Sequence, residues 1–363
     1  MLRTQVIDDG PSFLGLKERW AELLRRSYQN HFYLTHPYLF TWWKHLAGDA
    51  SLRIVLVTDG AELLAIAPLM HSRGKLARLP IRRVEPLGSG WGYGGIILSD
   101  KKPQCLEKIF DLLDDMNDWG LIYLPHTVGD PSIGPREIVR PDRQRPLAHD
   151  VDPTRIPFIS LDGSWEDYLA QRSTSFRRNI RNREKRMRRA GRTDFLRIGP
   201  ASDTRIPHDQ VMQWLRLIAE RSWKADAGSA ISSPRVFEFY SELAVRLNEE
   251  GQLDICFLFL DDRPVAYTFG AIYNHDYYEI DIAYDRELAK ISPGTLLRNR
   301  LLQELFGQGL RRLDFVMDFD YKKELTSESA EFCTHFIFRK RPYPLLLRYI
   351  KRKVQPLLKS RRS

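Results

Sequence analysis

The segment from residue 277 to residue 325 has the clearest pattern of hydrophobic and polar positions in the chain. At its start, apolar and acidic residues alternate: Tyr278, Ile280 and Ile282 against Glu279 and Asp281. This alternation predicts a strand, because successive side chains of a strand point to opposite faces. A loop, a helix and a second strand around residues 313–316 follow. Two strands joined by a helix form a crossover unit, so we expect them to be parallel.

The predicted helix of this segment begins with four residues that suit an anion site. Ser292 is a favourable N-cap, Pro293 fits the first helical position, and Gly294 has no Cβ to hinder a close approach. We expect the N–H groups of Gly294, Thr295 and Leu296 to point at a phosphate, assisted by the helix dipole. The buried side of the helix is predicted from its apolar residues, Leu297, Leu301, Leu302, Leu305 and Phe306. The alternative interpretation is a capped helix without a ligand.

The remaining periodicity predicts alternating helices and strands. Helices are predicted within 10–50 and at 103–119, 164–191, 211–223 and 234–249, and strands at 52–60, 62–72, 121–126, 157–162, 253–260, 265–273 and 332–340. Asp59-Gly60 between two strand-like runs predicts a hairpin. Residues 129–156 are rich in proline and lack periodicity, so we interpret them as a connection between two domains.

A glycine-rich stretch precedes the helix predicted at 103–119. Its glycines at positions 88, 90, 92, 94 and 95 indicate a loop whose backbone lies close to another group. We expect this loop to present Trp91 and Tyr93 to a substrate. No helix opens directly after it, so it is not a dinucleotide-binding fingerprint.

The net charge of +9 is concentrated in two segments. Residues 172–192 carry a local charge of +9 and residues 339–363 one of +10, which leaves about −10 for the rest of the chain. Basic patches on an acidic body indicate anionic partners. Arg177, Arg178 and Arg181 are therefore candidates for binding the phosphate of a substrate or membrane. A solvated surface helix is the alternative, and nucleic acid is disfavoured because no aromatic residues interleave with the arginines.

The last basic segment, residues 342–363, has an amphipathic pattern. Leu346, Ile350 and Val354 share one helical face, with Lys and Arg elsewhere. This pattern predicts either binding at an anionic membrane surface or a plain solvated helix. No apolar run approaches the roughly 20 residues needed to cross a bilayer, and the N-terminus lacks a secretory signal. We expect a cytoplasmic protein, peripheral on the inner face of the cytoplasmic membrane.

Cysteine and histidine give no sign of a metal site. The three cysteines are far apart and lack metal spacing, so they are expected to be reduced thiols. His31, His36 and His126 likewise have no partner at ligand spacing. We therefore expect no metal.

Four segments of the second half carry a family resemblance. They are SFRRNIRNREKRMRRAG, DDRPVAYTFGAIYNHDYYEIDIAYD, SPGTLL and LDFVMDFDYKKEL. Together they resemble the GNAT acyltransferase superfamily, in the branch of CelD-type and FemAB-like proteins with a BioF2-like acetyltransferase domain. The resemblance implies an α/β (α+β) fold, a mixed twisted sheet flanked by helices in two tandem GNAT-like domains. It places a degenerate domain at 1–128, a linker at 129–156, a catalytic domain at 157–341 and a basic tail at 342–363.

The resemblance also implies an acyl thioester donor and an amine acceptor. The backbone of Ile282 and Ala283 would lie along the pantetheine arm of acyl-CoA, and residues 292–296 would hold its phosphates. The usual phosphate loop of the family is replaced here by Ser292-Pro293-Gly294-Thr295. The donor is therefore open among acyl-CoA, an acyl carrier protein and aminoacyl-tRNA.

Acyl transfer to an amine needs a base for the ammonium proton and an acid for the leaving thiolate. We predict Asp314, Asp320 and Tyr321 as catalytic residues and Lys322 as an acceptor contact, with Asp318 nearby. The acceptor would be a cell-envelope precursor, either an amino sugar or an amino lipid such as a long-chain base. The alternatives are a FemAB-like transferase that uses aminoacyl-tRNA and a non-catalytic accessory protein of polysaccharide synthesis.

Overall fold

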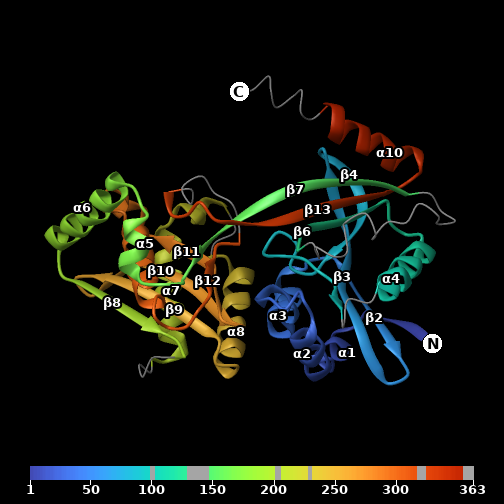
Figure 1. Cartoon of the computed structure of the whole chain (residues 1–363), viewed down its shortest axis with the longest axis horizontal. Coiled ribbons are helices and arrows are strands. Elements are labelled where there is room, and N and C mark those ends of the chain that lie inside the picture. Colours follow the sequence, from blue (N-terminus) through green and yellow to red (C-terminus); the bar gives the residue numbers. More distant parts are fainter. Residues whose placement is uncertain (99–102, 129–146, 201–205, 228–230, 317–323, 355–363) are drawn as a thin grey trace. The chain divides into compact units, whose positions relative to one another are not determined.

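The computed structural model describes residues 1–98, 103–128, 147–200, 206–227, 231–316 and 324–354. The chain divides into two compact units (Figure 1). Unit 1 consists of residues 1–155 and 331–363, and unit 2 of residues 156–330. Residues 331–341 thus group with unit 1, whereas the sequence placed them in the second domain. Their strand pairs with a strand of unit 1, and that long-range pairing has no local signal.

Unit 1 is a sheet with helices on both faces. Its elements are β1 (Leu2–Ile7), α1 (Gly10–Leu14), α2 (Lys17–Arg26), η1 (Phe32–Leu34), α3 (His36–Leu46), β2 (Ser51–Asp59), β3 (Glu62–Leu76), β4 (Leu79–Pro86), β5 (Ile97–Leu98), α4 (Pro103–Met116), β6 (Leu121–Val128), β13 (Ser329–Arg339), α10 (Pro342–Tyr349) and η5 (Ile350–Val354). The strand order is β1-β2-β3-β4-β6-β13, with β5 beside β3. Figure 1 shows α1, α2 and α3 on one side of β2 and β3 and α4 on the other.

Two predictions for unit 1 have a clear outcome. The hairpin at Asp59-Gly60 is confirmed, since β2 and β3 pair antiparallel from Asp59 and Glu62 onward. The linker predicted at residues 129–156 is described by the structure from residue 147 onward, and that part is not a loop. Residues 147–156 belong to β7 (Leu147–Ser160), a strand that continues from unit 1 into unit 2.

Unit 2 repeats the same architecture. Its elements are the end of β7, α5 (Trp165–Ala170), α6 (Thr174–Ala190), β8 (Thr193–Ile198), α7 (His208–Arg221), η2 (Trp223–Ala227), α8 (Pro234–Glu249), β9 (Leu253–Leu260), β10 (Arg263–Tyr273), β11 (Asp276–Tyr284), η3 (Arg286–Ile291), α9 (Pro293–Leu305) and β12 (Arg312–Asp314). The strand order is β7-β12-β11-β10-β9-β8. As predicted, β11 and β12 are parallel.

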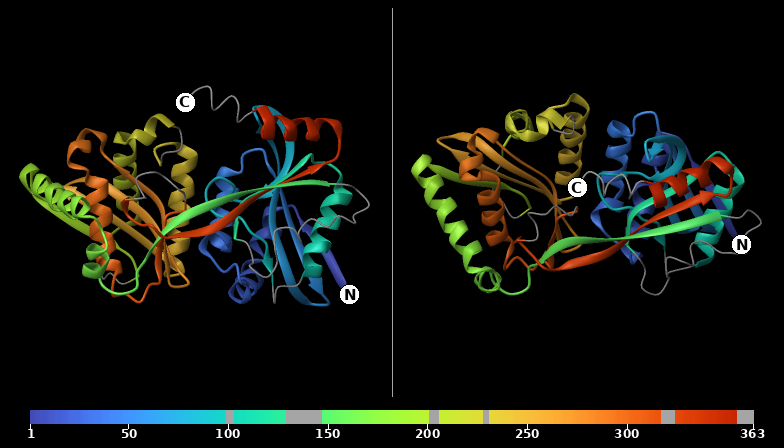
Figure 2. Two further views of the ribbon diagram at one scale, coloured as in Figure 1. Left: turned by 45° about the horizontal axis from the view of Figure 1, so that its top comes forward. Right: turned by 90° about the horizontal axis from the view of Figure 1, so that it is seen from above.

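Both faces of the unit 2 sheet are covered, because its central strands are apolar on both sides. Along β9, Phe257 packs edge-on against Trp214 of α7, while Cys256 and Leu258 belong to the apolar cluster beneath α6 and α9. Leu297, Leu301, Leu302 and Leu305 of α9 are buried in that cluster, which confirms the predicted side. Figure 2 shows α7 and α8 in yellow-green and yellow on one face, and α6 in green with α9 in orange on the other.

The two units share one topology, which the tandem prediction anticipated. In each, a first strand and a helical segment lead into three antiparallel strands, then a helix, then a strand parallel to the third of the three. The three strands are β2-β3-β4 in unit 1 and β9-β10-β11 in unit 2. The fold class is therefore the predicted one, a mixed α/β sheet flanked by helices.

Candidate functional site

The candidate site lies where β11 and β12 separate. Their ladder holds three pairs and ends with Tyr278 opposite Asp314, whereas β11 continues to Tyr284. In the described part of the chain, no strand pairs with this edge of residues 279–284. Ile282 and Ala283 pair on their other side with Thr268 and Tyr267 of β10. An unpaired strand edge offers N–H and C=O groups to an extended ligand, as it would to another strand.

The start of α9 lies beside the end of β11, but its geometry differs from the predicted cap. Ser292 adopts a left-handed conformation with φ 56°, and its side chain caps no N–H group. The N–H groups of Thr295 and Leu296 donate to the carbonyl of Ser292 at 3.1 and 3.2 Å. Of the three N–H groups predicted to face an anion, only that of Gly294 has no partner among the described residues. The helix start is thus a weaker anion site than predicted.

Gly294 is required for packing within the protein itself. A Cβ at this position would lie 2.9 Å from Cδ1 of Tyr284, the last residue of β11. Contacts this close force a neighbour to move. Because Gly294 has no side chain, the first turn of α9 can pack against the end of β11. The sequence analysis gave a different reason for this glycine, namely the close approach of a ligand.

A buried ion pair holds the same helix to the same strand. Arg298 of α9 donates from Nε and Nη2 to the two carboxylate oxygens of Glu279, both at 2.7 Å. The side chains are 6% and 3% exposed. This two-bond geometry fixes both groups, because the planar guanidinium matches the carboxylate. The sequence analysis did not identify Arg298, since nothing local distinguishes it from the exposed arginines of the chain.

A β-bulge directs two acidic residues of β11 to opposite faces of the sheet. The register with β10 shifts so that Ile280 is an extra residue between Glu279 and Asp281. Glu279 therefore faces α9, whereas Asp281 forms an ion pair with Lys224 of η2. The hydroxyl of Tyr267 donates to Oδ2 of Asp281 at 2.7 Å. Asp281 was missed as a site residue because a strand acid in an alternating pattern looks like a solvent-facing position.

Asp314, the predicted catalytic carboxylate, lies at the closed end of the separation. It is buried, and its Oδ1 accepts a hydrogen bond from the N–H of Val316 at 2.9 Å. Arg312 approaches Oδ2 at 3.6 Å. Asp318, Asp320, Tyr321 and Lys322 lie outside the described residues.

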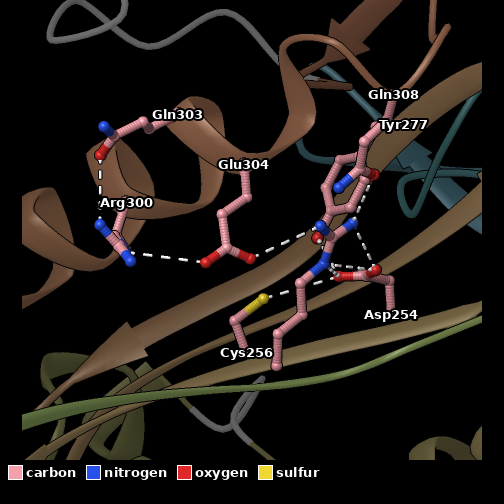
Figure 3. A network of polar contacts seen from close by, with 8 residues as sticks. Asp254, Cys256, Tyr277, Arg300, Gln303, Glu304 and Gln308 are labelled. Carbon is pink, nitrogen blue, oxygen red and sulfur yellow. Dashed lines mark hydrogen bonds and ion pairs between the residues drawn. The ribbon is translucent and has the colours of Figure 1, made fainter. Parts of the chain in front are cut away.

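A second buried ion pair, of Arg197 and Asp254, links the strands of this sheet (Figure 3). Asp254 of β9 is fully buried and receives Nε and Nη2 of Arg197 at 2.9 and 2.8 Å. Tyr277 and Cys256 lie within 3.6 Å of its Oδ1. Burial raises the pKa of the Cys256 thiol well above its usual value, so this cysteine is not a nucleophile. The network joins β8, β9, β11 and, through Glu304 at 3.7 Å, α9.

The arginine-rich helix α6 borders a pocket of about 780 Å³ within unit 2. Arg181 lines it, as does Arg177, but Arg178 does not. Nη1 of Arg177 donates to the carbonyls of Leu169, Ala170 and Arg172, so this residue stabilises the end of α5 instead of being available to a ligand. Asn299 of α9 also lines the pocket. It is 6% exposed, and both polar atoms of its amide lack a partner in the described part of the chain.

Unit 1 has an equivalent separation of parallel strands, but its own chain fills it. The ladder of β4 with β6 has two pairs, and the glycine-rich loop then forms a parallel bridge from Gly94 to Thr127. A Cβ on Gly94 would meet Cγ of Pro86 at 2.9 Å and the carbonyl of Pro125 at 3.0 Å. The close approach predicted for the glycine-rich loop is therefore an approach to the protein's own chain. The loop fills the position in unit 1 that corresponds to the unpaired edge of β11 in unit 2.

The two aromatic residues predicted to face a substrate differ in exposure. Tyr93 is buried between the rings of His31, Tyr33 and Phe332, so it is a core residue. Trp91 is partly exposed and lines a cavity of unit 1.

A family model described as an acetyltransferase (GNAT) domain matches residues 174–323. No protein of curated function matches the chain.

Two solved structures resemble the chain over nearly its whole length. FemX is 11% identical, with 96% of this chain and 100% of that chain covered at a TM-score of 0.56. The C-terminal domain of a putative lysylphosphatidylglycerol synthetase from Agrobacterium fabrum is 10% identical, with 95% and 97% covered and the same TM-score. At these identities the similarity shows the fold alone.

Proposed function

Since its GNAT acetyltransferase domain at residues 174–323 makes this protein an acyltransferase, we propose that it moves an acyl group from a CoA thioester to a primary amine. The observation that carries the proposal is the continuation of β11 to Tyr284 beyond its last pair with β12 at Tyr278. The pantetheine arm of CoA contains two amides, which can pair with such an edge as a strand does. Ile282 and Ala283 would bind this arm, as the family resemblance implies.

The phosphates of CoA would approach the start of α9. Gly294 supplies the N–H group that is left there, and the dipole of α9 favours negative charge at its first turn. Ser292, Pro293, Thr295 and Leu296 shape this turn through backbone geometry. The pair of Glu279 and Arg298 would keep the turn and the strand edge at a constant separation, so both ends of the donor would be held by one rigid crossover.

Asp281 is our candidate for the group that accepts the proton of the attacking ammonium. It precedes Ile282 directly, so its carboxylate belongs to the strand that would carry the thioester. Lys224 and Tyr267 orient it through an ion pair and a hydrogen bond. Asp314 is a second candidate, at the other side of the separation. The proton for the leaving thiolate would come from Tyr321 or Asp320, which stay proposals from the sequence.

A cell-envelope amine remains our proposed acceptor, and the C-terminal helices would bring the enzyme to an anionic membrane. Leu346 and Tyr349 of α10 are 51% and 60% exposed, although Leu347 is buried against unit 1. Some of the charge is neutralised, because Arg348 and Arg352 pair with Asp150. No helix within the described ranges is long and apolar enough to span a bilayer.

Thermal unfolding with acetyl-CoA, palmitoyl-CoA and free CoA tests the donor. A ligand at 100 times its Kd should add about 2.7 kcal/mol of stability. Release of free thiol in the presence of an amine then reports transfer. Asp281→Asn should reduce kcat at least a hundredfold, the usual contribution of a positioned base, and leave the stabilisation by CoA intact. Asp209→Asn, an exposed acid on α7, is the matched control.

If no CoA species shifts the unfolding temperature, the proposed CoA site on β11 is wrong. Transfer from aminoacyl-tRNA would then be the next assay. If CoA binds and transfer persists in both Asp281→Asn and Asp314→Asn, the donor site stands and the assigned base is wrong.

A further inference from the structure

A pocket of about 720 Å³ lies in unit 1 and shares no residue with the donor site. Its walls come from β3 and β4, from the turn after α4 and from the start of α10. All of these segments belong to unit 1, so the pocket is complete within that unit. The hydroxyl of Tyr343 donates to the carbonyl of Pro80 at 2.6 Å, which fastens α10 to the start of β4 (Figure 1). The charged residues of the wall are Arg73, Arg82, Arg341 and Asp118.

Arg73 and Arg82 form a cross-strand pair of like charge. They lie directly opposite each other in the antiparallel ladder of β3 and β4, so their side chains share one face of the sheet. Both are exposed, and neither guanidinium has an ion pair or a hydrogen bond within the described ranges. Arg73 also borders the cavity that Trp91 lines. Like charges in this arrangement destabilise a sheet, and an anion between them would remove the repulsion.

Arg341 brings a third guanidinium to the same pocket, and its position is fixed. Its Nη2 donates to Oδ1 of Asn117 at 2.5 Å. The same oxygen accepts a hydrogen bond from Nη1 of Arg339 at 2.6 Å, so the amide is itself held by the chain. An arginine has five N–H donors, and the contact with Asn117 uses one of them. The other donors of Arg341 can therefore meet a ligand.

Asp118 does not neutralise these three arginines. Arg53 donates to both of its carboxylate oxygens, from Nη1 at 2.9 Å and from Nη2 at 2.5 Å. These hydrogen bonds lower the pKa of Asp118, so the carboxylate is ionised and its charge is offset by Arg53. Asp118 is the one acid among the described residues of the wall. The three arginines therefore leave the pocket with an excess of positive charge, which favours an anionic ligand.

Phosphate is the anion that suits this arrangement. Guanidinium groups pair with phosphate in a planar geometry of two hydrogen bonds, and a phosphate has enough oxygens to meet groups from several sides. The rest of the wall is largely apolar, with Ile81 and Trp119 buried and with prolines at positions 80, 342 and 344. The volume is that of a site for a small organic ligand. A phosphate that carries an organic group therefore fits better than the bare ion.

The surroundings of the pocket indicate a membrane as the source of this phosphate. Large apolar side chains are exposed next to the pocket and along the helix that begins there, namely Leu79, Tyr343, Leu346 and Tyr349. Lys75 and Arg78 add exposed positive charge at the turn between β3 and β4. Exposed apolar side chains among basic ones are typical of a surface that rests on an anionic membrane.

We propose that this pocket binds the phosphate of an anionic phospholipid through Arg73, Arg82 and Arg341, while the lipid chains stay in the membrane. The membrane as the source rests on the attachment proposed above, whereas binding of an organic phosphate does not. The bound phosphate would also balance the like-charged pair of β3 and β4. Unit 1 thereby acquires a role that is independent of acyl transfer in unit 2.

Calorimetry of the full-length protein with a short-chain phosphatidylglycerol, kept below its micelle concentration, tests the pocket. This lipid should bind, and the matching phosphatidylcholine, which has no net charge, should bind at least about tenfold more weakly. Arg82→Gln should weaken phosphatidylglycerol about tenfold or more, the effect of losing a charged hydrogen bond. The double variant with Arg73→Gln should weaken it further. Arg3→Gln, at an exposed position of β1, removes the same charge and is the matched control.

Sedimentation with vesicles separates the pocket from general attraction to a charged surface. Vesicles of equal parts phosphatidylcholine and phosphatidylglycerol should bind the protein more tightly than vesicles of phosphatidylcholine alone. Lys75→Gln with Arg78→Gln removes two charges of the same hairpin but no residue of the wall. This double variant should leave binding of the short-chain lipid unchanged. In urea unfolding without lipid, Arg82→Gln should be no less stable than the wild-type protein, because it removes a like-charged pair.

Absence of binding by short-chain phosphatidylglycerol, or equal binding by Arg82→Gln and the wild-type protein, overturns the inference. Equal binding of glycerol 3-phosphate and the lipid also overturns it, because the pocket would then be a site for soluble phosphates. The outcome for the proposed function is separate. If CoA binds and the lipid does not, the acyltransferase proposal holds and the lipid site is wrong. If the lipid binds and CoA does not, the lipid site holds and the proposed function fails.

Discussion

The ion pair of Glu279 and Arg298 should be essential to the stability of unit 2. Arg298→Met keeps the length of the aliphatic stem but leaves the carboxylate of Glu279 buried, without either 2.7 Å hydrogen bond. Breaking a buried pair from one side costs about 3–5 kcal/mol. A charge interaction of about 4 kcal/mol at 4 Å and an effective dielectric constant of 20 has the same size. We therefore expect a loss of about 4 kcal/mol.

The double variant Glu279→Leu with Arg298→Met separates the charge effect from the loss of packing. It removes both charges, and replacement of a buried pair by apolar groups is often nearly neutral. We expect it to be about 2 kcal/mol more stable than Arg298→Met alone. Arg300→Met, on the same helix with 53% of its side chain exposed, should cost under about 1 kcal/mol.

Urea unfolding of the full-length variants measures these differences. Binding of the acyl donor should weaken together with stability, because the pair connects α9 to the strand edge that would hold CoA. KM for CoA is expected to rise more in Arg298→Met than in Arg300→Met. A loss below about 1 kcal/mol in Arg298→Met, or a double variant less stable than the single one, would refute the reasoning.

Three further predictions concern other buried groups. Arg197→Met should destabilise the protein by about 3–5 kcal/mol in urea unfolding, because Asp254 would remain buried and unpaired; an unchanged midpoint would contradict this. Gly94→Ala should cost about 1–3 kcal/mol, since its Cβ would meet Pro86 and Pro125, and should leave CoA binding unchanged. Burial and the neighbouring His149 lower the pKa of His335 from 6.5 to about 4. On acidification, His335 therefore binds a proton in the unfolded chain at a higher pH than in the folded protein. Its contribution to the free energy of unfolding is complete above pH 6.5 and decreases by about 3 kcal/mol towards pH 4. His335→Gln should flatten that part of the pH profile of stability, and an unaltered slope would show that the pair does not titrate this way.

Local patterns predicted most of the elements around the site. The strand from Tyr278 to Ile282 and the helix with the leucines of α9 follow from the periods of the two elements, and both were placed correctly. The bulge at Ile280 interrupts the predicted alternation within that strand. The parallel arrangement of β11 and β12 followed from the helix between them. The residues of the site were harder to predict, because their roles depend on partners far away in the chain.

Three examples show what the sequence alone did not contain. Arg298 and Asp281 have no local mark, and only the packing of α9 and the bulge at Ile280 give them their partners. Ser292 follows the statistics of an N-cap, yet it also ends the preceding turn η3 and has a left-handed conformation there. The glycines of the loop at 88–95 correctly indicated a close approach, but not that the neighbour was the protein's own chain.

The sequence by itself determined most of the helices and strands, the crossover around α9 and the resemblance to GNAT acyltransferases, because periodicity, caps and turns act over a few residues. It missed β1, β4 and β8, and it took the start of β7 for a linker. Tertiary structure alone decided which parallel strands remain open on one edge and which buried polar groups lack partners. Those properties depend on contacts between segments tens to hundreds of residues apart, as between Gly94 and Pro125 or Glu331 and Arg155. Pairings of this kind are selected by the free energy of the whole fold, which local patterns do not encode.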